Sequence, residues 1–267
     1  MPGYRSGEGD PAHTLALLWR EPGFGRSSRG PKQGLTVDRI VDLAVELADQ
    51  VGLDGVSMRS VAKALGVAPM SLYTYVPGKA ELLDLMVDTV YLRMPRPALD
   101  QKVWRARLTA IAQQNRALFK AHPWLVEVST ARPPLGPGLM AKYEYELRAF
   151  AGLNLDDVTT DDALAYLLTF VQAASRAALT ARASQRDTAM NDEQWWAANE
   201  PLLARVFDPE AYPTAVRIGS AAGAAHAAAY DADHAYTFGL ARVLDGLAGL
   251  VPNDLSAIVA SQQPPAV

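Results

Sequence analysis

The sequence predicts an all-α protein that consists of a small N-terminal helical unit and a larger C-terminal one. Apolar residues recur at three- and four-residue spacing along most of the chain, which is the period of a helix with a buried face. No segment alternates apolar and polar residues over the length of a strand. Glycine and proline interrupt the pattern at short intervals in the first unit and at longer intervals afterwards, so the first helices are expected to be the shorter ones.

Composition limits the class of protein. The chain has 267 residues, of which 49% are apolar and 20% are charged, as is usual for a protein with a buried core. No long uncharged apolar run predicts a membrane span, and no basic segment followed by an apolar stretch predicts a secretory signal. Cysteine is absent, which excludes disulfides, thiolate nucleophiles and cysteine-bound zinc and fits a cytoplasmic protein.

Residues 1–34 are expected to form a flexible basic arm. The stretch is rich in glycine, proline, arginine and serine, and such a composition buries little apolar surface. The apolar residues between Leu15 and Trp19 could form a short helical turn that docks elsewhere. Arg26, Arg29 and Lys32 precede the first long helix, where a basic arm could follow a phosphate backbone or enter a minor groove. An arm without function is the alternative.

The next unit, residues 35–93, contains a series of short helices. Four are predicted, over residues 36–51, 57–65, 69–76 and 79–91. Thr36 and Ser57 are good N-caps for the first two, because a side-chain oxygen can accept a free backbone N–H there. Gly52 tolerates the left-handed conformation that ends helices, and Pro69 suits a first helical position.

Residues 57–76 have the pattern of a helix-turn-helix. Ala62 is small where the two helices must cross, and Gly66 accepts a positive φ in the tight turn. Apolar residues pin both helices to the core: Val61, Leu65, Val67, Leu72 and Val76. The other face of the second of these helices then points outward, toward a major groove that such a helix can enter.

The charge pattern supports this interpretation. No Asp or Glu occurs between Ser57 and Ala80, whereas Arg59, Lys63 and Lys79 do, in a chain with a net charge of −4. A local basic patch on an acidic protein indicates one anionic partner at one place. A solvated helix face is the alternative for the charges, and a helical hairpin inside an enzyme is the alternative for the spacing.

A proline-rich stretch at residues 94–97 marks the start of the C-terminal unit, residues 94–255, and a flexible tail of residues 256–267 follows. Long helices are predicted over residues 104–121, 138–152, 160–182, 192–206 and 233–250. Residues 163–181 are apolar on nearly every side, as in a helix that is buried on two faces. Glycine costs roughly 1 kcal/mol in a helix interior, so Gly239 and Gly246 in the last helix indicate close approach of a partner helix.

From Thr36 to about Tyr91 the sequence resembles the DNA-binding domain of the TetR family, including the LYTYV core at residues 72–76 and Lys79 at the start of the fourth helix. His122-Pro123, Arg132-Pro133 and the Glu146-Leu147-Arg148 run resemble the ligand-binding domain of the tetracycline repressor and its near relatives. The resemblance implies a homodimer formed by a four-helix bundle, to which each subunit contributes two helices. The helices at residues 160–182 and 233–250 are the candidates.

The family's DNA contacts fall on seven residues of this sequence: Arg59, Pro69, Met70, Ser71, Tyr73, Thr74 and Lys79. Arg59 is a long cationic donor that could pair bidentately with guanine, and Met70 suits a thymine methyl group. The hydroxyl and ammonium groups of the set suit base edges or phosphates. Because one helix-turn-helix covers one half-site, the expected partner is a near-palindromic operator in double-stranded DNA.

The expected effector is a mostly apolar, drug-sized molecule. Aromatic and polar side chains on the middle helices could line its pocket: Trp104, Gln114, Trp124, Arg132, Tyr143, Glu146 and Phe170. Each aromatic residue could equally be an ordinary core residue. The family's tetracycline repressors hold magnesium through a histidine, and the matching position here is Val128, so the resemblance implies neither a metal-chelated tetracycline nor a bound metal or other cofactor.

Together these patterns predict a ligand-responsive transcriptional repressor that releases its operator when a small molecule binds. An enzyme is the rival, because His226 and His234 lie near Asp231 and Asp233. Capping of the last helix explains the aspartates, and no Gly-x-Ser-x-Gly elbow, phosphate loop or HExxH motif is present. A ligand-independent DNA-binding protein is the other alternative, although it would not need the long apolar C-terminal unit.

Overall fold

The computed structural model describes residues 4–20, 35–99, 103–226 and 231–251. Helices dominate these residues, and the only β pairing among them is an isolated bridge between Arg5 and Ser129, so the all-α prediction is confirmed. None of the described helices is long and apolar enough to cross a membrane. The N-terminal helices are α1 (Pro11–Leu18), α2 (Val37–Val51), η1 (Leu53–Gly55), α3 (Met58–Leu65), α4 (Pro69–Tyr73) and α5 (Lys79–Arg93).

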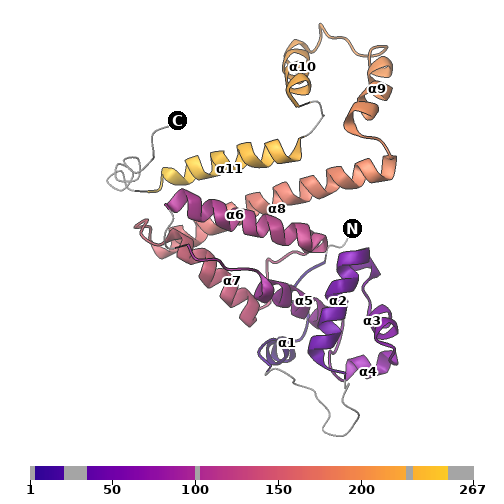
Figure 1. The fold of residues 1–267 in the computed structure, drawn as a ribbon, viewed down its shortest axis with the longest axis vertical. Helices are drawn as coiled ribbons and strands as arrows, with labels where there is room; N and C mark the ends of the chain where they lie inside the picture. The colour runs from indigo at the N-terminus through magenta and orange to yellow at the C-terminus, as the bar shows by residue number, and fades with distance from the viewer. Residues whose placement is uncertain (1–3, 21–34, 100–102, 227–230, 252–267) are drawn as a thin grey trace.

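The remaining helices are α6 (Trp104–Ala121), η2 (Pro123–Glu127), α7 (Pro137–Leu147), η3 (Arg148–Phe150), α8 (Asp157–Thr188), α9 (Asp192–Leu203), α10 (Pro213–His226) and α11 (Ala232–Ala248). In Figure 1, α6, α8 and α11 run alongside one another, and α9 and α10 project from them on the side away from α3 and α4. The sequence pattern predicts every long helix except α10. That helix is rich in alanine and glycine and has no buried residue, so no apolar stripe reveals it.

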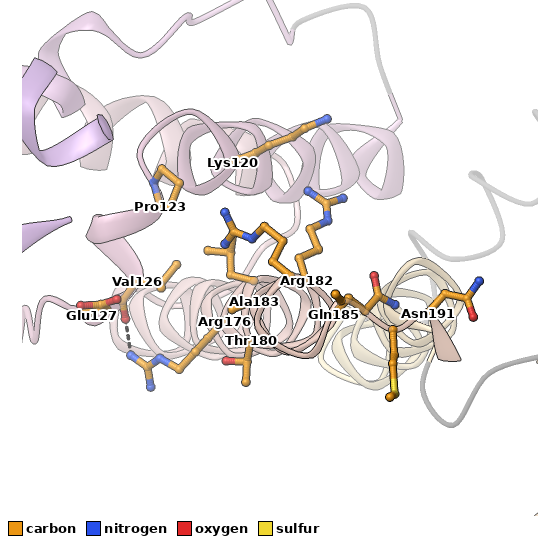
Figure 2. Close-up of a pocket in the computed structure, with 14 residues that line it drawn as sticks. Lys120, Pro123, Val126, Glu127, Arg176, Thr180, Arg182, Ala183, Gln185 and Asn191 are labelled. Carbon is orange, nitrogen blue, oxygen red and sulfur yellow. Dashed lines mark hydrogen bonds between the residues drawn. The ribbon is translucent and has the colours of Figure 1, made fainter. Parts of the chain in front are cut away.

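The larger unit has its core between α6, α8 and α11. Leu108, Leu167 and Leu240 pack there among other buried apolar residues. The prediction that α8 is buried on two faces is wrong for the single chain, because its buried residues, among them Leu164 and Val171, lie on one face. An open cleft lies at the other end of this unit, between the end of α6, η2 and the C-terminal half of α8 (Figure 2).

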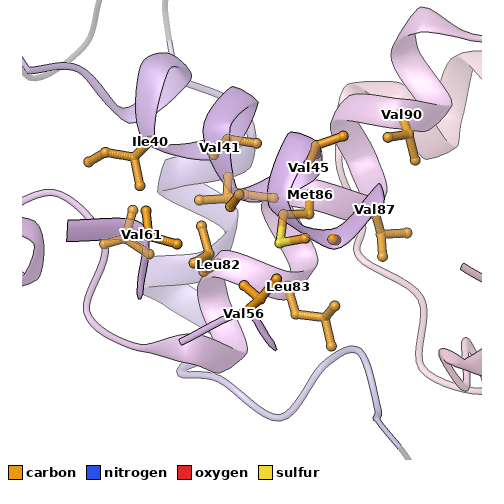
Figure 3. Packing of buried hydrophobic residues seen from close by; sticks show 14 of the residues in the cluster. Ile40, Val41, Val45, Val56, Val61, Leu82, Leu83, Met86, Val87 and Val90 are labelled. Atoms are coloured by element: carbon orange, nitrogen blue, oxygen red, sulfur yellow. The ribbon is translucent and has the colours of Figure 1, made fainter. Parts of the chain in front are cut away.

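The smaller unit is built around one continuous apolar cluster, part of which Figure 3 shows. Ile40 and Val41 of α2, Val61 of α3 and Leu82 of α5 meet in it and are fully buried. The cluster also includes Leu118 of α6 and residues of the segment after α6: Trp124, Leu125 and Val128. The apolar core therefore continues past the predicted boundary at residues 93 and 94 and joins the two units.

The predicted helix ends are confirmed in detail. The Thr36 hydroxyl accepts the backbone N–H of Arg39 at 3.2 Å, and the Ser57 hydroxyl accepts that of Ser60 at 3.1 Å. Gly66 ends α3 with a left-handed φ of 71°, which a residue with a side chain rarely adopts.

The predicted flexible arm is a different matter. Its described part, residues 4–20, is not loose but lies against the body of the protein. The Asp10 carboxylate caps α1 by accepting the backbone N–H of His13, and Leu17 and Leu18 are buried in the first core. The predicted short turn between Leu15 and Trp19 that docks elsewhere is confirmed as the end of α1. The flexibility predicted from composition is wrong for residues 4–20, because two leucines and a cap are enough to dock a short helix onto an apolar surface. The basic residues Arg26, Arg29 and Lys32, and the predicted tail at residues 256–267, lie outside the described residues.

Candidate functional site

The seven residues predicted to contact DNA are all exposed, on α3, on α4 with the residue that follows it, and at the start of α5. Leu72 of α4 and Val76, which follows that helix, have no exposed surface and fix α4 to the core. The opposite side of the helix is therefore turned out, with Met70 74% exposed and Tyr73 45% exposed. This is the orientation that the helix-turn-helix pattern predicts; contact with DNA itself stays a prediction.

The exposed surface of this unit offers the chemistry that DNA requires. Arg59 and Lys63 extend from α3, and the acid-free stretch of sequence keeps carboxylates off both helices. The Thr74 hydroxyl donates to the carbonyl of Ser71 at 2.7 Å, which leaves its oxygen free to accept from a base edge. Lys79 donates to the carbonyl of Leu53 at 3.3 Å, so its ammonium group is held at the edge of this surface.

None of the seven residues predicted to bind a ligand lines the cleft at the end of α6. Trp104 is buried in the core of the larger unit, and the Phe170 ring stacks on Tyr236 with 5.8 Å between centroids. The Gln114 amide donates to the Tyr145 hydroxyl at 3.0 Å. These three side chains therefore pack within the helical core.

The other four residues also have partners elsewhere. Glu146 is 1% exposed and accepts from Lys142 and Asn115, while the Tyr143 hydroxyl donates to Asp161. Arg132 is exposed in the loop before α7 and accepts a hydrogen bond through its backbone carbonyl. Trp124 is buried in the core of the smaller unit.

The cleft at the end of α6 is lined by different residues. Its volume is about 1080 Å³, and its walls come from α6, η2, α8 and the turn before α9 (Figure 2). The lining carries four cations and one carboxylate: Lys120, Arg176, Arg182, Arg186 and Glu127. Arg176 donates to the carbonyl of Val126, a contact drawn as a dashed line, and Gln172 donates to the same carbonyl at 3.4 Å. The volume is sufficient for a drug-sized molecule.

One cluster that the sequence analysis misses joins the two units. Asp49, near the end of α2, accepts from the Trp124 indole N–H at 2.8 Å and lies 2.9 Å from Nδ1 of His122. Asp49 lies more than seventy positions before His122 and Trp124 in the chain, so no local pattern links it to them. His122-Pro123 is part of the resemblance noted above, and that is the one signal that points to this place. The contact joins η2 directly to α2 of the smaller unit.

The histidines that suggested an enzyme lie at the junction of α10 and α11. The rings of His226 and His234 have their centroids 4.3 Å apart. The Asp231 carboxylate accepts the backbone N–H groups of Asp233 and His234, and the pKa of Asp231 is lowered, mainly by the bond from His234. Asp231 is therefore a helix cap, as predicted. The described residues contain no cluster of three or more His, Asp or Glu side chains that could hold a metal ion.

Comparison with known families gives two matches. Residues 40–86 match the model described as bacterial regulatory proteins of the tetR family. Residues 96–251 match the model of the tetracyclin repressor-like C-terminal domain. The two matches together span the helix-turn-helix and the larger helical unit.

Individual relatives agree with these matches. The HTH-type transcriptional repressor DrrR1 of Streptomyces coeruleorubidus is 43% identical, over 92% of this chain and 88% of its own length. The crystal structure of ActR of Streptomyces coelicolor in complex with actinorhodin has 28% identity and a TM-score of 0.68, over 82% of this chain and 98% of that one. The apo structure of ActR has the same identity and a TM-score of 0.63, over 80% of this chain and 97% of that one.

Proposed function

The chain belongs to the TetR family of bacterial transcriptional regulators, and on that premise we propose that it is a ligand-responsive repressor. In this proposal α3 and α4 bind a palindromic operator, and a small molecule bound in the larger unit releases it. The cytoplasm, where bacterial DNA lies, is the proposed place of action.

One observation carries the DNA-binding part of the proposal. The outward side of α4 exposes Met70, Tyr73 and their neighbours at one end of the fold, and no acidic residue occurs in either helix of the motif. A surface of this kind suits a major groove, because it combines donors, an apolar contact and positive charge. A helical hairpin that binds no anion has no reason to lack Asp and Glu on its exposed surface.

The effector part is supported by the cleft and by the crystal structure of ActR in complex with actinorhodin. The cleft shares its η2 wall with the core that contains Trp124, and Trp124 in turn contacts α2. A ligand that binds better to one position of η2 would shift the equilibrium toward the arrangement of the two DNA-binding units that goes with that position. A hundredfold loss of operator affinity requires a difference of about 2.7 kcal/mol between the two states.

A thermal-shift screen of antibiotics and hydrophobic metabolites, followed by operator-release assays on each hit, tests the effector part. At least one stabilising compound should lower operator affinity. Hits that stabilise the protein without changing DNA binding would contradict the mechanism of release.

Homodimerisation is proposed from the apolar surface that the single chain leaves uncovered. The helices α9 and α10 have no buried residue, and large apolar side chains on and around them are exposed: Trp195, Trp196, Leu202, Leu203, Val206, Tyr212 and Ile218. Soluble proteins rarely expose apolar surface on this scale unless a partner covers it. A second copy, packed against α9 and α10 as well as against α8 and α11, would cover it and would place two helix-turn-helix units on one operator.

The predicted glycine face needs a correction. A Cβ at Gly239 would lie 2.5 Å from the Phe170 ring of the same chain, so this glycine serves packing between α8 and α11 within one subunit. Gly246 differs, because nothing lies within 4 Å of a Cβ placed there. Only Gly246 stays a candidate for the partner interface.

Substitutions on the reading surface test DNA binding. Arg59→Ala is expected to weaken binding to the selected operator by about 1–3 kcal/mol and to relax the preference at one base pair. Tyr73→Ala and Lys79→Ala should weaken binding to all sequences, because they remove contacts to phosphates. Fluorescence anisotropy with duplexes selected from a random pool, at two salt concentrations, measures both effects.

Arg148→Ala is the matched control for these variants. Arg148 is exposed in η3, outside α3, α4 and the surface proposed for the partner subunit, and its removal changes the net charge by the same amount as the loss of Arg59. The control should bind operator as the wild type does. Normal binding by Arg59→Ala would show that Arg59 makes no base contact, and failure to select any duplex would overturn the proposed function.

A leucine at Gly246 tests the dimer. Within one chain the new side chain meets open space, so the subunit should fold normally. If the partner helix lies against this face, Gly246→Leu should give monomers in analytical ultracentrifugation. Gln113→Leu, which adds a leucine at an exposed position of α6, should stay a dimer. A dimer of Gly246→Leu as stable as the wild type would place the interface on another face.

A further inference from the structure

The segment before the helix-turn-helix unit touches both units of the protein. On the side of the larger unit, the backbone N–H of Ser129 donates to the carbonyl of Tyr4 at 2.8 Å, and that of Ser6 donates to Ser129 at 3.1 Å. The buried hydroxyl of Ser6 also donates to the carbonyl of Arg132 at 2.7 Å. Residues 4–6 are therefore fastened by backbone pairing to the loop that follows η2.

Gly7 makes this fastening possible. Its φ of +72° is a left-handed conformation that favours glycine, and a Cβ there would lie 2.9 Å from the carbonyl oxygen of Arg132. An alanine would be strained by its backbone and would also push the loop away. A glycine at position 7 therefore allows the segment to lie close against the loop. A loose arm would not need a glycine there.

The other side of the segment holds the DNA-binding unit. The Tyr4 hydroxyl donates to the carboxylate of Asp54 in η1, and this bond is the main reason that the pKa of Tyr4 is raised to about 12. The Lys79 ammonium group lies 4.9 Å from the centroid of the Tyr4 ring, a cation–π distance. Lys79 is the residue proposed above to contact phosphate.

Two buried carboxylates of α5 keep the segment in place. Both oxygens of Asp84 accept the backbone N–H of Gly7, at 3.0 and 3.2 Å, and Glu81 accepts that of Asp10 at 3.2 Å. Burial raises the pKa of Asp84 to about 6, although the bond from Gly7 opposes the shift. Departure of the segment would leave a buried carboxylate without its donor, which is costly.

The same loop leads back to the cleft. Val126 forms part of the cleft wall, and its carbonyl accepts from Gln172 and Arg176 of α8. Ser129 follows three residues later and is paired with Tyr4 and Ser6. Three residues of chain and one backbone hydrogen bond therefore connect η2 with Tyr4, whose ring lies beside Lys79. A displacement of η2 by a bound molecule would reach Tyr4 along this path.

We propose that residues 4–20 form a tie between the loop at residues 129–135 and the DNA-binding unit, in which Tyr4 is a positioning residue for Lys79. The inference rests on the proposed function, because it assigns the tie a role in DNA binding. The C-terminal end of the tie also contacts both units. The Trp19 indole N–H donates to the carbonyl of Leu135 at 2.8 Å, and Arg20 forms an ion pair with Asp38 of α2. The tie adds to the contact between Asp49 and Trp124.

A double-mutant cycle tests the positioning role. The probe is the operator duplex that the wild-type protein selects from a random pool. Tyr4→Ala is expected to weaken binding roughly three- to fivefold, as for the loss of one exposed cation–π contact. In the Lys79→Ala background the same change should have almost no effect, because the positioned group is gone. Tyr4→Phe, which keeps the ring beneath Lys79, should restore most of the affinity.

Hydrogen exchange of the full chain tests the tie. Addition of the duplex should slow amide exchange in residues 128–136 of the wild type, and Tyr4→Ala and Gly7→Ala should each lose most of this response. Leu15→Ala, at an exposed position on α1, is the control and should keep it. Gly7→Ala acts at the loop and Tyr4→Ala at η1, so either variant serves if the other folds poorly.

Additive losses in the cycle, or a loop response that survives in the folded variants, would overturn the tie while leaving the proposed function intact. Failure to select a duplex would instead overturn the proposed function, and the tie with it.

Discussion

Gly138→Ala is expected to destabilise the protein by about 3 kcal/mol or more, at the upper end of what an overpacked contact costs. A Cβ at Gly138 would lie 1.9 Å from the carbonyl oxygen of Asp88 and 2.8 Å from the backbone nitrogen of Leu92, so α5 and α7 must separate. Backbone atoms cannot turn aside as a side chain can. Urea denaturation of the variant and of the wild type measures the loss.

Gly138→Ala would also remove hydrogen bonds that stabilise a buried carboxylate. The buried Asp88 carboxylate accepts the backbone N–H groups of Gly138 and Leu139 at 3.1 and 2.8 Å, at the start of α7. Burial raises the pKa of Asp88, and these two bonds counteract that shift. Separation of the helices would leave the carboxylate buried without donors.

Gly223→Ala is the matched control. A Cβ at this position of α10 meets nothing within 4 Å, and alanine has the higher helix propensity, so stability should rise slightly or stay the same. Equal urea midpoints for Gly138→Ala and the wild type would show that α5 and α7 are not in close contact in solution.

Glu146→Leu is expected to cost about 3–5 kcal/mol, because it leaves a buried ammonium group without its counter-charge. The Lys142 ammonium group lies 2.7 and 2.8 Å from the two carboxylate oxygens of Glu146, and the Asn115 amide donates to one of them at 2.6 Å. All three residues are buried. The loss would appear in urea denaturation without any ligand present, as a structural role of Glu146 requires.

The double variant Lys142→Met, Glu146→Leu isolates the cause. With both charges replaced by apolar groups of similar size, most of the lost stability should return, since no charge is left unpaired. Glu144→Leu, at an exposed position of the same helix, should change stability by at most about 0.5 kcal/mol. A double variant no more stable than Glu146→Leu alone would show that packing, rather than the stranded charge, sets the cost.

Predictions from sequence succeeded where one short stretch contains the whole signal. Thr36 and Ser57 cap their helices, Gly66 has a positive φ, and Leu72 and Val76 face inward, each for a reason that lies within a few residues. The outward set on α4 followed from the same periodicity. The exposed face of the helix-turn-helix could therefore be predicted from the sequence, whereas its contacts with DNA stay a prediction.

Predictions were weaker where partners are far apart in the chain. Trp124 and Glu146 were expected at a ligand, but one donates to Asp49 and the other closes a buried ion pair. Within a flexible arm the sequence predicts only a short docking turn near Leu15, whereas the structure also fastens Ser6 and Gly7 to α5 and the loop before α7. An aromatic ring or a carboxylate looks the same in sequence whether it meets a ligand, a partner helix or another side chain.

The sequence by itself determined the helices, their caps, the turn of the DNA-binding motif and the absence of acids from it, because helix formation depends on neighbours within one or two turns. Only the tertiary structure decided which buried groups meet, that Gly138 serves the contact between α5 and α7, and that the N-terminal segment joins the two units. These contacts depend on how apolar faces pack and on where buried polar groups find partners, and both are set by the whole chain.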